Sequence, residues 1–415
     1  MRATAVPGGM TALWVMAAWG AAWLLSSSVG RVEAIETTVF WLPTGVALGV
    51  AVAVAGWRLP WVLGGAAAAA AIAALVEGRP VATALGFAAI EAAAVGVAAW
   101  IGRTGRDAVD PRIAWAAQTG AAAAVALVGA TAALPLWSAI APANSLAAEW
   151  RAWAVSGFVG ALLTVPPIVA LSGFRAKRSG GMGTRPFVAG AAAFAAFVGC
   201  AAAIFQGDVS DRFGGAVGPT LAYLPLAPLI ASAVLWGARG GPLAIAAGAL
   251  LVIGWTGAGR GPFAEVEGFA GEAMLEVQGY VAVAALLAGW MLAQQAAVAA
   301  ALARATDWQL RYRQVLEGTG TIAVTIDAVC GACRWGEGAA SQPGGAPADV
   351  AAWIARAEPA DQPLMRAEWA ALTGGRQPAA LWRWPHAQAR LAAVRGPDGE
   401  VELVTGLVQR VAHGG

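Results

Sequence analysis

Histidine, cysteine and charged residues are scarce in this sequence of 415 residues. With two histidines and three cysteines, one of them in an apolar stretch at Cys200, the chain has little material for a metal centre or a disulfide framework. Charged residues make up 12% of the chain and the formal net charge is +2, so no basic stripe is available to neutralise nucleic-acid phosphates. These shortages exclude a disulfide-rich secreted protein and a nucleic-acid-binding protein.

Hydrophobic residues, in contrast, form 59% of the chain, and the mean hydropathy is +0.65, which is typical of an integral membrane protein. Ten apolar runs approach membrane length, at residues 10–26, 39–56, 60–76, 81–101, 113–140, 150–172, 186–205, 220–237, 242–257 and 277–298. The third and ninth runs are the shortest. We therefore predict a polytopic α-helical membrane protein with about ten transmembrane helices, or eight without these two.

Charges are unevenly spread, with 28 in residues 1–300 and 22 in residues 301–415. This predicts a membrane domain at 1–298, a linker helix at 299–318 and a small soluble domain at 319–415. Nine basic and two acidic residues fall in the loops that share a side with both termini, against five basic and ten acidic residues in the others. The positive-inside rule then places both termini in the cytoplasm.

The stretch 40–64, FWLPTGVALGVAVAVAGWRLPWVLG, carries a Pro-Thr-Gly step inside a predicted helix. Such a step frees backbone groups, which a bilayer tolerates only where neighbouring helices or a cavity satisfy them. Trp41, Pro43 and Gly45 are therefore candidate ligand-binding residues, with Trp41 and Pro43 expected at the outer interface. The step either lines a pocket or only lets helices pack closely.

Seven short motifs follow one another along the first 263 residues. They are Trp41-Leu-Pro-Thr-Gly-Val-Ala-Leu-Gly, Trp57-Arg-Leu-Pro-Trp, Leu63-Gly-Gly, Gly157-Phe-Val-Gly-Ala-Leu-Leu-Thr-Val-Pro-Pro, Tyr223-Leu-Pro-Leu-Ala-Pro, Trp236-Gly-Ala-Arg-Gly-Gly and Gly257-Ala-Gly-Arg-Gly-Pro-Phe. Together they resemble the first class of membrane-associated sensor (MASE) domains of bacterial receptors. The resemblance implies an input module in the bacterial inner membrane, of the kind that precedes a diguanylate cyclase, a phosphodiesterase or a histidine kinase.

Glu91 lies near the middle of the fourth predicted span. An ionisable group at that depth is costly and tends to face a cavity or a partner, so Glu91 is a candidate ligand-binding, proton-binding or switching residue. The alternative is a protonated or hydrogen-bonded packing residue, which is favoured by the absence of an intramembrane Lys or Arg in the sequence pattern.

The loop around Arg260, Pro262 and Phe263 is a second candidate ligand site. Its glycines allow a close backbone approach, and Arg260 has the charge to bind an anion on the outer side. The simpler interpretation, a turn between two spans with Arg260 among the lipid headgroups, is favoured because glycine and proline commonly mark turns.

After the last span the helix is expected to continue, with Ala305, Trp308, Tyr312 and Val315 recurring every three or four residues. Such a seam predicts either a homodimer through the 302–316 helix or packing of this helix on the following domain. Only about two heptads are present, which leaves both alternatives open.

The tail is predicted to form strands at 321–327, 334–336, 379–384, 388–394 and 401–408, with helices at 347–357 and 362–372. This order, with the turn Gly396-Pro-Asp-Gly399, resembles a PAS domain, so the small soluble domain is expected to be α+β, PAS-like and cytoplasmic. The segment 336–358 is short and rich in Gly and Pro where a PAS cofactor pocket would lie, so we expect no bound haem or flavin and no other cofactor.

Two remaining motifs in the tail have simple explanations. His386 follows Pro385 in a predicted turn and is expected to be a solvated side chain. Cys330 and Cys333 have redox or metal spacing, but no second ligand pair completes a zinc site and the strand-to-helix context of a redox motif is missing. A turn with two incidental thiols is the favoured interpretation.

No catalytic output domain is recognised in the tail, which has no Walker glycine run and no phosphoacceptor histidine on a helix and ends soon after the last predicted strand. We therefore expect a non-enzymatic sensor whose output comes from a separate protein, such as a diguanylate cyclase or a histidine kinase.

Two alternative functions stay open. One is a transporter, suggested by Glu91 and by proline breaks at Pro43, Pro166 and Pro225 but disfavoured because no convincing repeat relates the two halves of the sequence. The other is a scaffold that only docks partners.

Overall fold

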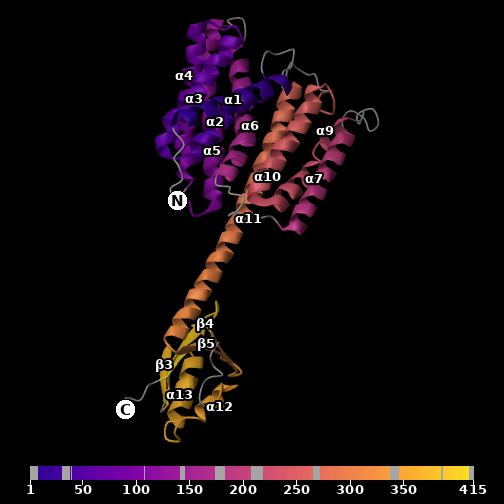
Figure 1. Cartoon of the computed structure of the whole chain (residues 1–415). Coiled ribbons are helices and arrows are strands. Elements are labelled where there is room, and N and C mark those ends of the chain that lie inside the picture. The colour runs from indigo at the N-terminus through magenta and orange to yellow at the C-terminus, as the bar shows by residue number, and fades with distance from the viewer. Residues whose placement is uncertain are drawn as a thin grey trace. The chain divides into compact units, whose positions relative to one another are not determined.

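The computed structural model describes residues 8–29, 38, 40–106, 108–140, 145–172, 183–206, 218–264, 272–336, 345–384 and 387–410. The chain divides into two compact units, Met1–Ala299 and Ala300–Gly415. The first unit is helical, and the second is built around a small sheet (Figure 1).

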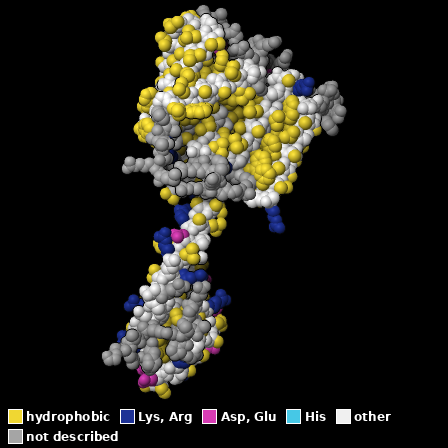
Figure 2. All heavy atoms as spheres, in the orientation of Figure 1, with side chains coloured by type: hydrophobic (Ala, Val, Ile, Leu, Met, Phe, Trp, Pro, Cys, Tyr) yellow, Lys and Arg dark blue, Asp and Glu magenta, His cyan; other side chains and the backbone are white. Residues whose placement is uncertain are grey.

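Eight helices in the described part of the chain are long and apolar enough to cross a membrane. They are α1 (Gly8–Val29), α3 (Leu59–Val76), α4 (Val81–Thr104), α5 (Pro111–Ile140), α6 (Leu146–Ser172), α7 (Thr184–Phe205), α10 (Leu226–Gly257) and α11 (Glu272–Gly318). Figure 2 shows apolar side chains spread over this unit. The predicted class, a polytopic helical membrane protein, is confirmed.

Helix α2 (Leu42–Ala53) has only 12 residues, about 18 Å at 1.5 Å per residue against about 30 Å of bilayer hydrocarbon. It packs against α1, α4 and α6 (Figure 1) and is followed by a 3₁₀ turn, Gly56–Arg58, that leads into α3. The predicted run 39–56 is therefore a short helix and does not span the membrane. Hydropathy could not reveal the true length of this helix, because residues 40 and 41 are as apolar as the helix but lie outside it.

Helix α10 reverses direction at Gly237, whose φ of 64° and ψ of −163° lie outside the helical region. A Cβ at Gly248 would lie 2.7 Å from Leu229 Cδ1, although these residues would be about 28 Å apart in one straight helix. Residues 226–236 and 238–257 are therefore antiparallel arms of one hairpin. The first arm, about 17 Å long, is the second short segment, so the two short runs are the second and eighth and not, as predicted, the third and ninth.

One local arrangement occurs in both halves of the membrane unit, although the sequence shows no convincing repeat between them. In each half an aromatic-Leu-Pro step, at 41–43 and 223–225, comes just before or at the start of a short helix that ends in a glycine-containing turn. The following long helix then runs parallel to the helix before the step. In the first half Ala12 meets Gly65 and Trp23 meets Glu77, and in the second Phe197 meets Gly248 and Phe205 meets Trp255.

The prolines do not break helices in the way predicted. Pro43 lies in the first turn of α2, where a proline costs no hydrogen bond, and Pro225 is the N-cap residue of α10. Pro166 lies within α6, which continues through it to Ser172. These positions explain how the prolines are accommodated without exposing backbone groups to lipid.

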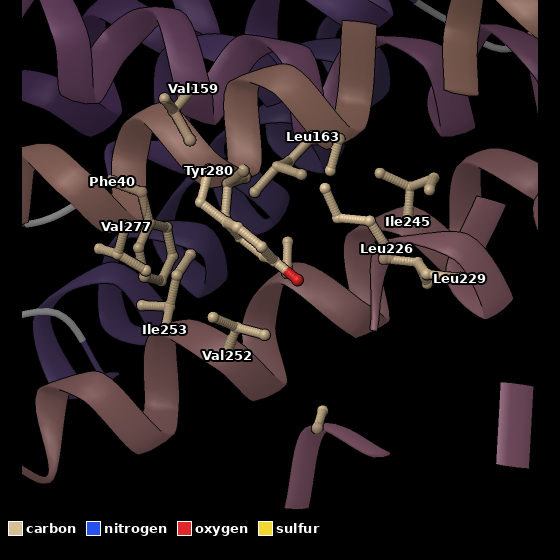
Figure 3. Packing of buried hydrophobic residues seen from close by; sticks show 14 of the residues in the cluster. Phe40, Val159, Leu163, Leu226, Leu229, Ile245, Val252, Ile253, Val277 and Tyr280 are labelled. Carbon is tan, nitrogen blue, oxygen red and sulfur yellow. The ribbon is translucent and has the colours of Figure 1, made fainter. Parts of the chain in front are cut away.

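A buried apolar cluster joins the two halves. Tyr280 of α11 lies among Phe40, Val159 of α6, Leu226 of the first α10 arm and Val252 of the second (Figure 3). A second cluster lies within the first half and contains many alanines of α2, α3 and α4. Small side chains let these helices approach closely, as the alanine content predicted.

The second unit contains a five-stranded antiparallel sheet in the order β2-β1-β5-β4-β3. Its strands are β1 (Thr321–Asp327), β2 (Cys333–Trp335), β3 (Ala379–Trp384), β4 (Ala387–Arg395) and β5 (Val401–Arg410), with helices α12 (Val350–Ile354) and α13 (Gln362–Thr373) between β2 and β3. All five predicted strands and the Gly396–Gly399 turn are present, with Gly399 at φ 85°. The predicted helix 347–357 is shorter, because Asp349 caps it through a 2.7 Å bond from the Ala352 N–H.

Candidate functional site at the start of helix α2

Helix α2 begins in the interior of the helical bundle. Trp41, which precedes it, contacts Trp19 at the middle of α1, with ring centroids 5.9 Å apart in an edge-to-face arrangement. The Trp41 backbone N–H donates to the Ser156 carbonyl in α6 (3.0 Å), and the Leu42 N–H donates to the Ser26 hydroxyl (3.2 Å). These bonds satisfy backbone donors that a helix start leaves free. Trp41 and Pro43 therefore lie against α1 and α6, where the helices of the bundle pack together.

Glu91 of α4 faces this helix start and is 8% exposed. The Trp19 indole N–H donates to Glu91 Oε1 (2.9 Å), and the Thr44 hydroxyl donates to Glu91 Oε2 (2.7 Å). The Trp41 indole N–H in turn donates to Thr44 Oγ1 (3.0 Å). Among the described residues no Lys or Arg contacts Glu91, so hydrogen bonds and the positive end of α2 stabilise it.

The opposite end of α2 is held by arginines of α4 and of the turn that follows it. Arg103 donates to the Ala51 carbonyl through Nε (2.9 Å) and Nη2 (2.6 Å), and Arg106 donates to the Val54 carbonyl through Nη1 (2.9 Å). Cations at a helix C-terminus complement its partial negative charge. Helix α4 thus places a carboxyl group at the start of α2 and a guanidinium group at its end.

Glycines allow α2 to lie directly against α6. A Cβ at Gly45 would lie 2.7 Å from Ala161 Cα and 2.8 Å from the Gly160 oxygen, and a Cβ at Gly160 would clash with the Trp41 carbonyl. Of the predicted candidates, Gly45 therefore serves packing. Trp41 belongs to the Glu91 hydrogen-bond network, and Pro43 starts the helix beside it.

The four polar side chains form a chain from Trp41 through Thr44 and Glu91 to Trp19, drawn from three helices and the segment before α2. Glu91 accepts on both oxygens, so a proton or a cation at this carboxyl would compete with these bonds. Trp19, Thr44 and Arg103 were missed as site residues. Only its place in the Pro-Thr-Gly step could have marked Thr44 as a site residue. Nothing in the sequence around Trp19 or Arg103 indicates that these residues contact α2.

Comparison with known proteins identifies the membrane unit. The profile of the MASE1 family matches residues 9–304, well over half of the chain. The chain belongs to the MASE1 family. MASE1 is a membrane-associated sensor domain, so this multi-pass membrane protein carries a sensory input domain that is not itself catalytic. No curated protein and no solved structure matches the chain significantly.

The second predicted ligand site lies elsewhere in the MASE1 domain. Phe263 is 2% exposed and packs against Phe205 and Tyr280, with ring centroids 5.6 and 5.5 Å apart. Pro262 is buried and Arg260 is exposed, its backbone N–H donating to the Trp255 carbonyl (3.0 Å). The loop therefore covers an aromatic cluster of the second half and contributes no residue to the Glu91 network.

Outside the MASE1 match, Cys330 lies in the turn before β2, as predicted, whereas Cys333 is the first residue of that strand. Cys200, Cys330 and Cys333 are all free thiols. Burial, with the nearby Asp349 charge, raises the pKa of Cys333 to about 11, so its reactive thiolate is scarce near neutral pH. The backbone N–H groups of Cys330 and Val329 lower the pKa of Asp327, which holds this turn. No group of possible metal ligands occurs in the described residues, and His386 lies outside them.

Proposed function

We propose that this protein is the membrane-embedded input component of a bacterial signal-transduction system. It senses an unidentified stimulus in the inner membrane, with both termini in the cytoplasm, and passes the signal to a separate output protein such as a diguanylate cyclase or a histidine kinase. The MASE1 match supports the sensory class, and the comparisons lend no support to the transporter alternative.

The single observation that carries the proposal is the buried Glu91 network at the start of α2. An intramembrane carboxyl group is expensive unless it has a structural or functional use. Here it joins α1 and α4 to a helix too short to span the bilayer. A stimulus that breaks the bond between Glu91 and Thr44 would release one end of α2 while Arg103 still holds the other.

Helix α11 is the proposed route for the signal. It has 47 residues and continues without interruption from the membrane unit into residues 300–318. Trp308, Tyr312 and Val315 are 72%, 55% and 62% exposed, so the described residues of one chain leave most of this face uncovered. This favours a homodimer through residues 302–316 over packing on the following domain.

Residues 319–415, the part of the second unit that follows α11, are proposed to form a PAS-like domain. Its 2-1-5-4-3 strand order and the two helices between β2 and β3 support this assignment. A cluster of four tryptophans fills the side of the sheet that packs on α12; Trp353 stacks on Trp384 with ring centroids 5.2 Å apart. Such dense packing agrees with a domain that transmits a signal without a haem or flavin.

The test is co-purification of the protein from native membranes after mild crosslinking, followed by assays of cyclase and kinase activity in the eluate. We expect an output enzyme whose activity differs between the wild type and Glu91→Gln, because the amide cannot accept from Thr44 and Trp19 in the same way. Flux of a substrate into vesicles that contain this protein alone would overturn the proposal.

Glu77→Gln is the matched control for Glu91→Gln. Glu77 also accepts from an α1 tryptophan, since the Trp23 indole N–H donates to its Oε1 at 3.2 Å, but this pair is exposed. We expect Glu77→Gln to leave the output activity at the wild-type level. Equal changes in both variants would mean that the effect reflects lost charge in general and not the buried network.

A further inference from the structure

A groove of about 360 Å³ lies where the first half of the membrane unit meets the second. Leu25 of α1, Val46 of α2 and Pro167 of α6 line one part of it, and Ala246 and Leu250 of the second α10 arm line the other. This volume is at the lower end of the range for ligand sites, and such sites often lie between the helices of a bundle.

The groove offers a ligand almost no hydrogen bonds. Its lining is aliphatic except for Thr164, whose hydroxyl donates to the Gly160 carbonyl at 2.8 Å. The Leu42 backbone N–H, at the start of α2, is likewise occupied by Ser26. A ligand with carbonyl, hydroxyl or charged groups would lose its bonds to water here without replacement, so the lining selects for plain hydrocarbon.

The groove is only partly enclosed, and its lining residues Ala21 and Leu25 are exposed on the surface of α1. Bilayer contact is established for this domain by its class, and a hydrocarbon chain reaches the groove laterally without crossing water. We propose that the groove binds one acyl chain of a bilayer phospholipid.

Occupancy of the groove bears directly on the Glu91 network. Leu42 and Val46 line the groove, and Thr44 between them bonds to Glu91 on another side of α2. An acyl chain in the groove presses α2 toward α4, and an empty groove removes that support from a short helix. If the stimulus is the acyl-chain composition of the bilayer, this groove is where the protein detects it. That role rests on the proposed sensory function, whereas the binding site itself does not.

The experiment uses the full chain in nanodiscs made from a phospholipid that carries a diazirine in the middle of one acyl chain. After illumination, labelled residues are mapped by peptide mass spectrometry. We expect Val46 and Leu250 to be labelled in the wild type. In Ala246→Phe their labelling should fall about tenfold, because the ring occupies the space of the acyl chain.

Ala247→Phe is the matched control, since Ala247 is exposed on the same helix and does not line the groove. It should leave labelling of Val46 and Leu250 unchanged, and labelling of the lipid-exposed Leu85 should be constant in all variants. If Ala246→Phe does not fold, Ala21→Phe fills the groove from α1.

Labelling of Val46 and Leu250 that is equal in Ala246→Phe, Ala247→Phe and the wild type would overturn the site, as would their complete absence from the wild-type map. The activity of the co-purified output enzyme is measured in the same nanodiscs. Loss of groove labelling without a change in that activity would leave the binding site intact and remove the sensing role assigned to it.

Discussion

The two halves of the membrane unit start their short helices with the same aromatic-Leu-Pro step but surround it differently. In the first half, Thr44 follows Pro43 and bonds to Glu91 of α4. In the second half, Tyr223 precedes Pro225 and packs against Tyr280 of α11, with ring centroids 5.6 Å apart. One backbone arrangement thus carries a polar network in one half and an aromatic cluster in the other. The asymmetry localises the candidate sensing site to the first half.

The largest effect on stability is expected where an added Cβ meets backbone atoms, which cannot move aside as side chains can. A Cβ at Gly160 meets the Trp41 carbonyl and lies 3.1 Å from the Leu42 nitrogen, whereas a Cβ at Gly248 meets only side chains, of Leu229 and Phe197. Gly160→Val should destabilise the protein by about 3 kcal/mol or more and Gly248→Val by about 1–2 kcal/mol, because side chains can rotate away. Unfolding in SDS, followed by circular dichroism, measures both, and equal losses would contradict the difference between the halves.

The next effect compares the two residues that face the helix starts. Glu91→Ala leaves the Trp19 N–H and the Thr44 hydroxyl buried without acceptors, which should cost about 2–3 kcal/mol. Tyr280 is 2% exposed, and its hydroxyl has no hydrogen-bond partner among the described residues. Tyr280→Phe removes no hydrogen bond and should therefore leave stability unchanged or raise it. The same SDS titration distinguishes these outcomes, and a large loss for Tyr280→Phe would reveal a second polar site.

A smaller effect is expected at the end of α2. Arg103→Gln removes the Nε and Nη2 bonds to the Ala51 carbonyl and should cost about 1–2 kcal/mol. Arg106→Gln removes one exposed bond to Val54 and should cost about half as much. The rate of amide hydrogen exchange in the last turn of α2 should rise more in Arg103→Gln than in Arg106→Gln. The reverse order would mean that Arg106, not Arg103, holds this end of the helix.

The smallest effect should be the same in both halves. Pro43 and Pro225 each stand at a helix start, where proline restricts the unfolded chain and removes no helical bond. Pro43→Ala and Pro225→Ala should each lower stability by about 0.4–1 kcal/mol in matched SDS titrations. A much larger loss at Pro43 alone would show that it shapes the Glu91 network directly.

The membrane class, the order of the apolar runs and all five strands of the tail were predictable, because hydropathy and period-two alternation are local properties of the chain. Glu91 could be singled out for the same reason, since a carboxyl group in an apolar run is visible in any window. The lengths of α2 and of the first α10 arm were not predictable. Their ends are set by contacts with α1, α6 and other neighbours, and an apolar extended segment looks like an apolar helix.

Composition alone decided that this protein crosses a membrane, and the ordered motifs around Trp41 decided its family. Only the tertiary structure decided what Glu91 does. Its partners lie 72 and 47 residues away, at Trp19 and Thr44, and come within hydrogen-bond distance because α2 starts inside the bundle. The transfer free energy favours insertion of each apolar segment into the bilayer separately. A hydrogen bond between two helices requires them to be packed together, and that packing depends on the whole helical unit.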